Sequence, residues 1–357
     1  MEKAKFDKLH YSWRDIDGYD KNVNIVISPR ELGKTTTWWC QKAYPCWKRK
    51  EAIVYLVRNI NEITDEMISS IFEQNINKFY DDEKPIYKAN FKDGVVDIFL
   101  EDKETKEKFR AIRIIALSCK LRKLKQTTIP NLRYMFIDEY IINPNVNESY
   151  LKDEAFKIKE LFSTLKRGAI NERLKFYVAG NPYSLFNPLF VDLNVDVSKL
   201  RLGEKYIGDD FIIDYPKLNP LLKEKIMKEN PFYKFDESYS TFAVEGTAIN
   251  DMNIPLGDRP INFSLKYIFR INNTFLGIYK NNSNNGDYSY YCEELETFSR
   301  IRDVYCIDLK DMIAKTILLS NEEKFYLNRF KDSFAKQNVL FSNINCYYYV
   351  KEIFSKL

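Results

Sequence analysis

The chain has 357 residues, of which 45% are hydrophobic and 30% charged, and its formal net charge is +4. This composition predicts a folded protein of two domains, or of one large domain with an extension. The six cysteines form no CxxC pair and His10 is the only histidine, which excludes a zinc ribbon and a His-rich metal site. The first residues lack the apolar core of a signal peptide and the chain has no apolar run of about 18 residues, so we expect a cytoplasmic protein without a membrane span.

The first 200 residues alternate short apolar runs with amphipathic stretches, which is typical of an α/β protein. Helices are predicted at 33–43, where Pro45 should end the helix, and at about 150–167, where apolar residues recur at helical spacing. The apolar runs predict strands at 23–28, 52–57, 95–100, 110–117, 133–137 and 174–179.

The sequence changes in character after about residue 187, where prolines recur and several follow asparagine. This pattern predicts a linker with a short helix at 218–229. From about residue 240 the chain again has a strand-rich pattern, and it ends in two predicted helices. The elements expected there are strands at 265–271, 274–279, 288–292 and 303–308 and helices at 321–333 and 347–357.

Residues 28–35, SPRELGKT, indicate a phosphate-binding loop between a predicted strand and a predicted helix. They match the pattern GxxxxGK[ST] except at the first position, where Ser28 replaces glycine. Backbone amides around Gly33 can cradle phosphates, Lys34 can reach the β- and γ-phosphates, and Thr35 can hold Mg²⁺. The loop therefore predicts binding of ATP with Mg²⁺. Its candidate binding residues are Ser28, Arg30, Gly33, Lys34, Thr35 and Thr36.

Residues 134–139, YMFIDE, predict an apolar strand that ends in two carboxylates. Such a strand end is costly to bury unless the charges have a partner or a task. Asp138 fits a residue that holds Mg²⁺ and its water, and Glu139 fits the general base that activates the attacking water. An exposed Asp-Glu pair at a strand end is common, but its occurrence together with the phosphate-binding loop favours the catalytic interpretation.

A glutamate directly after the strand aspartate is typical of the P-loop branch that has an additional strand between the two motif strands, and this branch consists mostly of motors. The next predicted strand ends in Gly180-Asn181-Pro182. Asn181 could contact the γ-phosphate or the attacking water and so sense hydrolysis. Alternatively, Asn-Pro is simply a turn.

Several cations could act on a neighbouring subunit or on DNA. Arg167, at the end of a predicted helix, is the first candidate for an arginine that stabilises the transition state in a neighbour's site, although the helix dipole also favours a cation there. Residues 120–125, KLRKLK, could line a DNA channel or reach a neighbour's nucleotide, but charge runs are usually solvated. The candidates for contacting DNA or acting in trans are Arg58, Lys120, Arg122, Lys123 and Lys125.

Two aromatic residues lie upstream of the loop. Tyr11 and Trp13 could stack on an adenine base. Packing in the core is the commoner fate of such residues, so both interpretations stay open.

Residues 30–36, RELGKTT, resemble the Walker A loop of large terminase subunits, in which the missing first glycine is tolerated. The segments 134–139 and 180–181 resemble the Walker B and coupling motifs of that family, and 230–246 resembles the segment that joins its ATPase and nuclease domains. Full terminases are longer and end in an active RNase H-like nuclease, whereas only about 110 residues follow Gly246 here. The chain is therefore more similar to the compact DNA encapsidation ATPases of Picovirinae-type phages.

This resemblance implies an α/β fold with a P-loop ATPase domain of the ASCE type at 1–200, a linker or lid at 201–245, and a small α+β domain of vestigial RNase H-like type at 246–357. It implies an ATP-driven translocase of double-stranded DNA that packages the viral genome into the procapsid. The expected assembly is a homo-oligomeric ring, a pentamer, on the phage portal or connector, with a packaging RNA as a partner in the best known case. We expect the protein in the host cytoplasm and transiently at the portal vertex.

Three alternatives stay open at this point. The first is a terminase-like enzyme whose C-terminal aspartates bind two metal ions and cut DNA, which would require these carboxylates to converge. The second is another P-loop DNA translocase or helicase. The third is a scaffold that binds nucleotide without hydrolysing it, although the complete set of motif residues argues against this.

Overall fold

The structure is a computed structural model, and it divides the chain into two compact units, residues 1–184 with 200–249 and residues 185–199 with 250–357. These boundaries differ from the expected division at residues 200 and 245, because most of the expected linker belongs to the first unit. The residues that the structure describes are 4, 6–80, 83–88, 91, 93–120, 129–143, 149–168, 174–185, 187–230, 254–271, 273–283, 288–297, 303–319 and 327–355.

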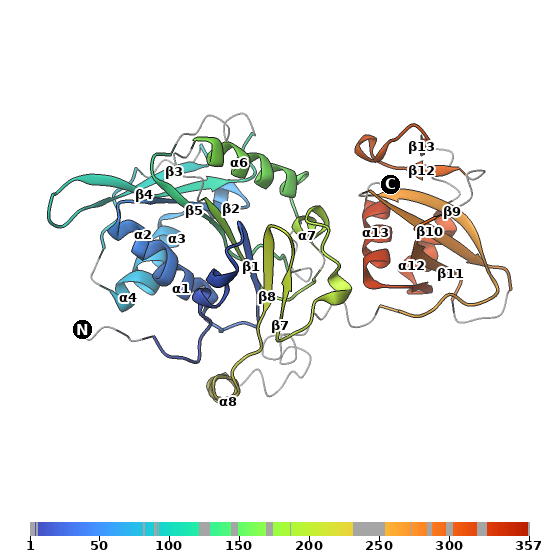
Figure 1. The fold of residues 1–357 in the computed structure, drawn as a ribbon, viewed down its shortest axis with the longest axis horizontal. Coiled ribbons are helices and arrows are strands. Elements are labelled where there is room, and N and C mark those ends of the chain that lie inside the picture. Colours follow the sequence, from blue (N-terminus) through green and yellow to red (C-terminus); the bar gives the residue numbers. More distant parts are fainter. Residues whose placement is uncertain are drawn as a thin grey trace. The chain divides into compact units, whose positions relative to one another are not determined.

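The first unit is built on an eight-stranded sheet in the order β3-β4-β2-β5-β6-β1-β8-β7 (Figure 1). The six central strands in this order, β4, β2, β5, β6, β1 and β8, are parallel to one another. At the two edges, β3 pairs antiparallel with β4 and β7 pairs antiparallel with β8. The central strands are nearly continuous apolar runs because both faces of the sheet are covered. The strands are β1 Val23–Ile27, β2 Ala52–Val57, β3 Val95–Glu101, β4 Lys108–Ala116, β5 Leu132–Ile137, β6 Lys175–Gly180, β7 Glu204–Ile207 and β8 Phe211–Tyr215.

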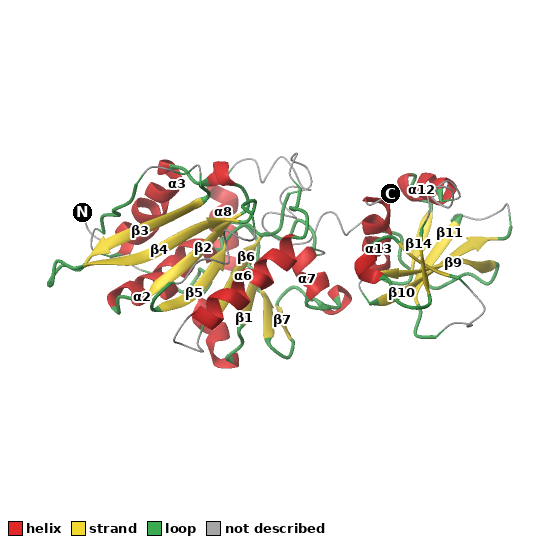
Figure 2. Cartoon of the chain, turned by 90° about the horizontal axis from the view of Figure 1, so that it is seen from above, coloured by secondary structure: helices red, strands yellow, loops and turns green. Residues whose placement is uncertain are grey.

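Helices cover both faces of this sheet, with α1 to α4 on one face and α6 on the other (Figures 1 and 2). The π-helical turn η2 lies between α1 and α2, and a second π-helical turn, η4, lies between α3 and α4. These two turns pack against each other. The helical elements are η1 Trp13–Tyr19, α1 Lys34–Trp38, η2 Trp39–Ala43, α2 Tyr44–Lys48, η3 Ile60–Glu62, α3 Asp65–Ser70, η4 Ile71–Ile76, α4 Asn77–Phe79, α6 Glu154–Gly168 and α8 Pro220–Glu229.

The helix after the phosphate-binding loop does not end before Pro45, as we predicted, but continues to Lys48. The π-helical turn η2 comes directly before α2, so that Pro45 lies in the first turn of α2. Proline is tolerated in a first helical turn, where its missing N–H is not needed. The prediction was wrong because the sequence pattern does not reveal the change of helix type.

The expected linker at 201–245 instead contributes β7 and β8 to the sheet. All five residues of β8 are buried, and the strand pairs in parallel with β1. The run FIIDY forms the whole strand, and the prolines at 216 and 220 come after it, so they do not interrupt it. The helix predicted at 218–229 is present as α8.

The second unit contains a mixed six-stranded sheet in the order β13-β12-β9-β10-β11-β14 (Figure 1). The strands β9, β10 and β11 form an antiparallel meander, and β12 and β14 add in parallel to its two sides. Helices α12 and α13 pack on one face through a core that includes Leu276, Phe330, Phe341 and Val350. The elements are α7 Pro188–Asp192, η5 Val197–Lys199, β9 Phe263–Ile271, β10 Thr274–Asn281, β11 Tyr290–Glu294, β12 Val304–Cys306, η8 Leu309–Asp311, β13 Thr316–Leu318, α12 Asn328–Ala335, β14 Val339–Phe341 and α13 Ile344–Ser355.

The four strands predicted for this unit are present, whereas β13 and β14 have only three residues each and were missed. Of the helix predicted at 321–333, the residues up to 326 lie outside the described part, and α12 begins at Asn328.

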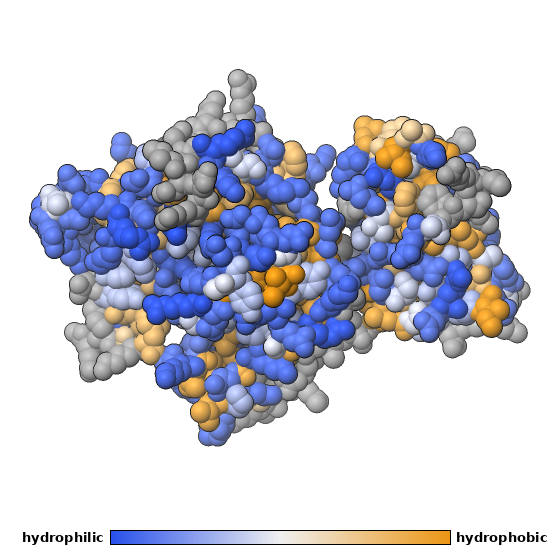
Figure 3. Space-filling view, viewed as in Figure 1, coloured by the Kyte–Doolittle hydropathy of each residue, from blue (hydrophilic) through white to orange (hydrophobic). Residues whose placement is uncertain are grey.

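The surface of the second unit includes apolar atoms around η8 and β13, whereas hydrophilic residues dominate the face of the first unit that Figure 3 shows. The exposed large apolar side chains of that segment are Leu309, Met312, Ile313, Ile317 and Leu318. Within the described residues, every helix is too short or too polar to cross a membrane.

Candidate active site

The three predicted motifs meet at one edge of the first sheet. Strand β6 lies between β1 and β5 and is parallel to both, as the Asp-Glu pair predicted. Because Ile27 pairs with Gly180 and Ile137 with Val178, the three strands end at the same edge. The loop after β1, the acidic pair after β5 and Asn181 after β6 are thereby brought together.

The phosphate-binding loop has a special backbone conformation. Gly33 has φ +77° and precedes the first turn of α1, and a methyl group at this position would lie 2.9 Å from Cδ2 of His10. Glu31 also has a left-handed φ of 61°, which is uncommon for a residue with a side chain. Ser28 is fully buried and its N–H donates to the carbonyl oxygen of Gly180 at 3.1 Å. The serine that replaces the consensus glycine is therefore accommodated inside the protein, next to the end of β6.

Lys34 is only 7% exposed, and its Nζ donates to Oδ1 of Asn181 at 2.7 Å. Burial lowers the pKa of Lys34, and the negative charges of Asp138 and Glu139 oppose this shift. The lysine of the loop and the amide after β6 therefore form one unit, as expected if Asn181 responds to what Lys34 binds.

The hydroxyl of Thr35 donates to Oδ2 of Asp138 at 2.6 Å, and Oδ1 of Asp138 accepts the N–H of Glu139 at 2.9 Å. Asp138 is partly buried, and this burial raises its pKa, opposed by the charge of Lys34 and the hydrogen bond of Thr35. A hydroxyl and a carboxylate beside a phosphate site are the hard oxygen ligands that Mg²⁺ takes together with phosphates. The donor set therefore fits Mg²⁺ as predicted from the sequence.

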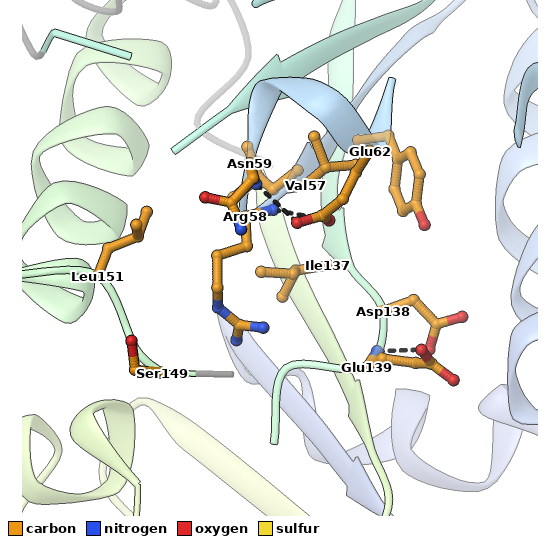
Figure 4. A pocket seen from close by; sticks show the side chains of 11 residues that line it. Val57, Arg58, Asn59, Glu62, Ile137, Asp138, Glu139, Ser149 and Leu151 are labelled. Atoms are coloured by element: carbon orange, nitrogen blue, oxygen red, sulfur yellow. Dashed lines mark hydrogen bonds between the residues drawn. The ribbon is translucent and has the colours of Figure 1, made fainter. Parts of the chain in front are cut away.

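Glu139 is exposed and has a left-handed backbone with φ 49°. Such a conformation is strained in a residue other than glycine, and strain of this kind concentrates at functional sites. Glu139 and Asp138 line a cavity of about 500 Å³ at the carboxyl ends of β2 and β5, together with Arg58 and Glu62 (Figure 4). The general-base candidate therefore borders a space with room for water beside the phosphate-binding loop.

Arg58 forms an ion pair with Glu154 at 3.1 Å, and it donates to the carbonyl oxygen of Tyr140 at 2.7 Å. The side chain of Arg58 is 12% exposed and that of Glu154 is fully buried. Little of Arg58 is therefore available to a DNA phosphate, and its position favours a role at the cavity wall. The sequence offered a weak signal for Glu154, since an acidic residue is favoured at the start of a helix such as α6.

Two further predicted binding residues lie beside the loop. Arg30 donates through Nη2 to the hydroxyl of Tyr183, and its guanidinium lies 5.8 Å from the centre of that ring. Thr36 donates to Oδ1 of Asn75 at 2.7 Å. Tyr183 and Asn75 were not predicted from the sequence, because neither belongs to a motif.

The cations proposed to act in trans lie apart from these contacts. Arg167 is exposed near the end of α6, and its Nε donates to the carbonyl oxygen of Ser163 at 3.2 Å. Lys120 is exposed, whereas Arg122, Lys123 and Lys125 lie outside the described residues. The trans-acting and DNA-contacting roles stay proposals.

The carboxylates of the second unit could form a nuclease metal site only if several of them converge. Among the residues that the structure describes, no three His, Cys, Asp or Glu side chains converge in a way that could hold a metal ion. The C-terminal aspartates considered for a nuclease site are Asp251, Asp258, Asp303, Asp308 and Asp311, and Asp251 lies outside the described residues.

Comparison with known proteins gives a family match over nearly the whole chain. The family described as podovirus DNA encapsidation protein (Gp16) matches residues 5–357. A structure titled as the bacteriophage Phi-29 viral genome packaging motor assembly has 20% identity and a TM-score of 0.70, and the alignment covers 98% of this chain and 99% of that chain. The Phi-28 gp11 DNA packaging motor has 18% identity and a TM-score of 0.61, with 94% and 95% covered. No curated protein sequence matches.

Proposed function

This chain belongs to the podovirus DNA encapsidation protein (Gp16) family, and we propose that its first unit uses the site at Lys34 and Glu139 to drive double-stranded DNA into the procapsid. The protein is a DNA-packaging ATPase, and the family resemblance inferred from its motifs is confirmed. The residue roles, the cofactor and the assembly described below are proposals.

The observation that carries the proposal is the pair of contacts that join the motifs, from Lys34 to Asn181 and from Thr35 to Asp138. Lys34 binds the β- and γ-phosphates. Thr35 and Asp138 would hold Mg²⁺, which when bound neutralises charge that develops on the phosphates. Glu139 accepts the proton of the attacking water from the cavity beside the loop.

Asn181 is coupled to the occupancy of the site through Lys34. Nζ of Lys34 has three donors, so it can bind a phosphate while one donor still holds Asn181, which keeps the amide beside the phosphate that the lysine binds. Asn181 then turns toward the γ-phosphate or the attacking water. Loss of the γ-phosphate reverses this movement of Asn181, and the segment after β6 transmits the movement to the residues that bind DNA.

The working assembly is a homo-oligomeric ring, a pentamer, on the portal or connector in the host cytoplasm. The Phi-29 structure, titled as a motor assembly, supports an oligomeric arrangement. Arg167 of one subunit completes the charge clamp in its neighbour's site. Lys120 and the basic run that follows it contact DNA phosphates without reading bases, so that binding is salt-sensitive. A packaging RNA is a further partner.

The second unit is a reduced RNase H-like domain. Its antiparallel meander, with parallel strands added beside β9, supports this interpretation. We expect a domain of this kind to serve assembly and not to cut DNA, since no three of its described carboxylates converge on a metal site.

The experiment that tests the proposal is steady-state ATP hydrolysis by the wild-type chain and by Glu139→Gln, with and without double-stranded DNA. We expect DNA to stimulate the wild type, and Glu139→Gln to bind ATP while its rate falls about 100-fold or more. Glu62→Gln, which changes a second carboxylate at the same cavity, is the matched control and should stay close to wild type. Equal rates for Glu139→Gln and wild type would show that the catalytic strand is assigned wrongly.

A further inference from the structure

The segment 7–13, which we call the strap, lies against the phosphate-binding loop. The N–H of Tyr11 donates to the carbonyl oxygen of Leu32 at 2.9 Å. Nε1 of Trp13 donates to the carbonyl oxygen of Lys34 at 2.7 Å. His10 lies over Gly33, between these two contacts. The strap therefore contacts three consecutive residues of the loop, Leu32, Gly33 and Lys34.

The strap is attached on its other side to the sheet. The hydroxyl of Tyr11 donates to Oδ2 of Asp214 at 2.9 Å, and Nζ of Lys205 lies 3.5 Å from the same oxygen. Asp214 belongs to β8 and is 3% exposed, and it pairs with Val26 near the end of the strand that leads into the loop. Tyr11 is thus linked through its backbone to the loop and through its side chain to a strand beside the loop.

The conformation of the loop explains why such support is needed. Glu31 and Gly33 both have left-handed backbones, and this region is unfavourable for a residue with a side chain such as Glu31. The loop also has Ser28 where the consensus has glycine. A strained loop persists only where the surrounding structure fixes it. The strap supplies contacts of this kind at Leu32, Gly33 and Lys34.

We propose that Tyr11 is a positioning residue of the nucleotide site, which holds the phosphate-binding loop in its binding conformation by joining Leu32 to Asp214. This inference rests on the proposed function, because it assumes that ATP binds at this loop. Tyr11 and Trp13 act on the backbone of the loop, at the carbonyl oxygens of Leu32 and Lys34. Burial raises the pKa of Tyr11, which keeps the hydroxyl a neutral donor.

The test removes the hydroxyl alone, by Tyr11→Phe, and measures KM and kcat for ATP together with equilibrium binding of a fluorescent ATP analogue. We expect KM and the dissociation constant of the analogue to rise about tenfold, the effect of one buried hydrogen bond to a charged group. The value of kcat should stay within about twofold, because Tyr11 does not touch the reacting atoms. Tyr134→Phe, which removes a hydroxyl from the amino-terminal half of β5, is the matched control and should leave both values unchanged.

A second pair of variants separates positioning from simple stability. Asp214→Asn keeps an oxygen that accepts the hydrogen bond of the Tyr11 hydroxyl, so it should retain most of the affinity for the ATP analogue. Asp214→Leu removes this acceptor, so its affinity should fall as much as that of Tyr11→Phe. In the double variant Tyr11→Phe with Asp214→Leu, the two losses should not add, because both remove the same contact. Thermal unfolding of each variant without nucleotide provides the comparison of stability.

The outcomes distinguish this inference from the proposed function. Unchanged analogue binding by Tyr11→Phe, with a wild-type chain that binds, would overturn the positioning role alone. A fall in unfolding temperature without a change in KM would also overturn it, since the contact would then serve only the fold. A wild-type chain that does not bind the analogue would overturn both the proposed function and this inference.

Discussion

Lys34 and Asn181 are 147 residues apart in the sequence, and their side chains form a buried hydrogen bond of 2.7 Å between Nζ and Oδ1. This bond joins the loop that binds phosphate to the end of the neighbouring strand β6. The amide oxygen accepts from one of the three donors of this lysine, which leaves two for phosphate oxygens. If Lys34 binds phosphate as we propose, this contact links the nucleotide to the end of β6.

Substitutions of Asn181 should separate binding from hydrolysis. Asn181→Ala removes the competing acceptor, so ATP should bind as well as to wild type or better, while hydrolysis falls about 10- to 100-fold through loss of a polar contact in the transition state. Asn181→Asp places a carboxylate beside Lys34, which should repel the phosphates and weaken binding. Equilibrium binding and steady-state rates measure the two effects. An unchanged rate for Asn181→Ala would remove the residue from the mechanism.

Asp138→Asn should abolish hydrolysis and raise the stability of the nucleotide-free chain. Burial raises the folded-state pKa of Asp138 above its ordinary value of 3.8, so the folded state binds the proton more tightly than the unfolded state. The cost of the buried charge is present above the raised pKa and disappears as the pH falls through it. The advantage of Asp138→Asn in unfolding temperature should thus be largest near neutral pH and shrink toward acid pH.

The control for this measurement is Asp20→Asn, because Asp20 is exposed and Lys175 lowers its pKa. Asp20→Asn should not stabilise the chain at any pH. A pH-independent difference between Asp138→Asn and wild type would show that the charge of Asp138 is not the cause.

Glu154→Ala should destabilise the first unit strongly. The substitution leaves the guanidinium of Arg58 buried without its carboxylate partner, and breaking a buried ion pair in this way costs about 3–5 kcal/mol. The double variant Arg58→Met with Glu154→Leu removes both charges and should recover much of the loss. Unfolding in urea measures the free energies. A loss below about 1 kcal/mol would be typical of an exposed pair and would contradict this interpretation.

Mixing two inactive variants tests whether Arg167 acts in a neighbouring subunit. Arg167→Ala keeps its own Lys34, and Lys34→Ala keeps its own Arg167, so a mixed ring contains interfaces at which both residues are present. In a ring with head-to-tail interfaces, random mixing in equal amounts should place an intact Lys34 opposite an intact Arg167 at roughly a quarter of the interfaces. The mixture should therefore show roughly a quarter of the wild-type ATPase rate. A mixture that is no more active than the two variants alone would argue against action in trans. Binding of ATP by Arg167→Ala alone should be normal.

The nucleotide site could be predicted from the sequence because its chemistry lies in short, contiguous motifs. The loop at 28–35 follows an apolar strand and precedes a helix, and the pair Asp138-Glu139 ends another strand. The structure adds that the motifs meet, because the parallel strands that carry them end at the same edge of the sheet. The additional strand β6 between β1 and β5 confirmed the branch that the Asp-Glu pair indicated.

Contacts between distant residues could not be predicted in the same way. No local pattern relates Arg58 to Glu154 or Tyr11 to Asp214, since these pairs come together only when the strands are ordered in the sheet. The strand β8 was missed because its short apolar run is followed by prolines, which suggested a linker.

The sequence by itself determined the phosphate-binding loop, the acidic pair and the strands that carry them, because hydrophobic periodicity and motif chemistry act over a few residues. The tertiary structure alone decided that Asn181 bonds to Lys34, that Arg58 turns inward to Glu154, and that Tyr11 holds the loop. The physical reason is that burial and hydrogen bonding depend on which strands are neighbours. The order of the strands is set by the packing of the whole sheet, and no short segment specifies it.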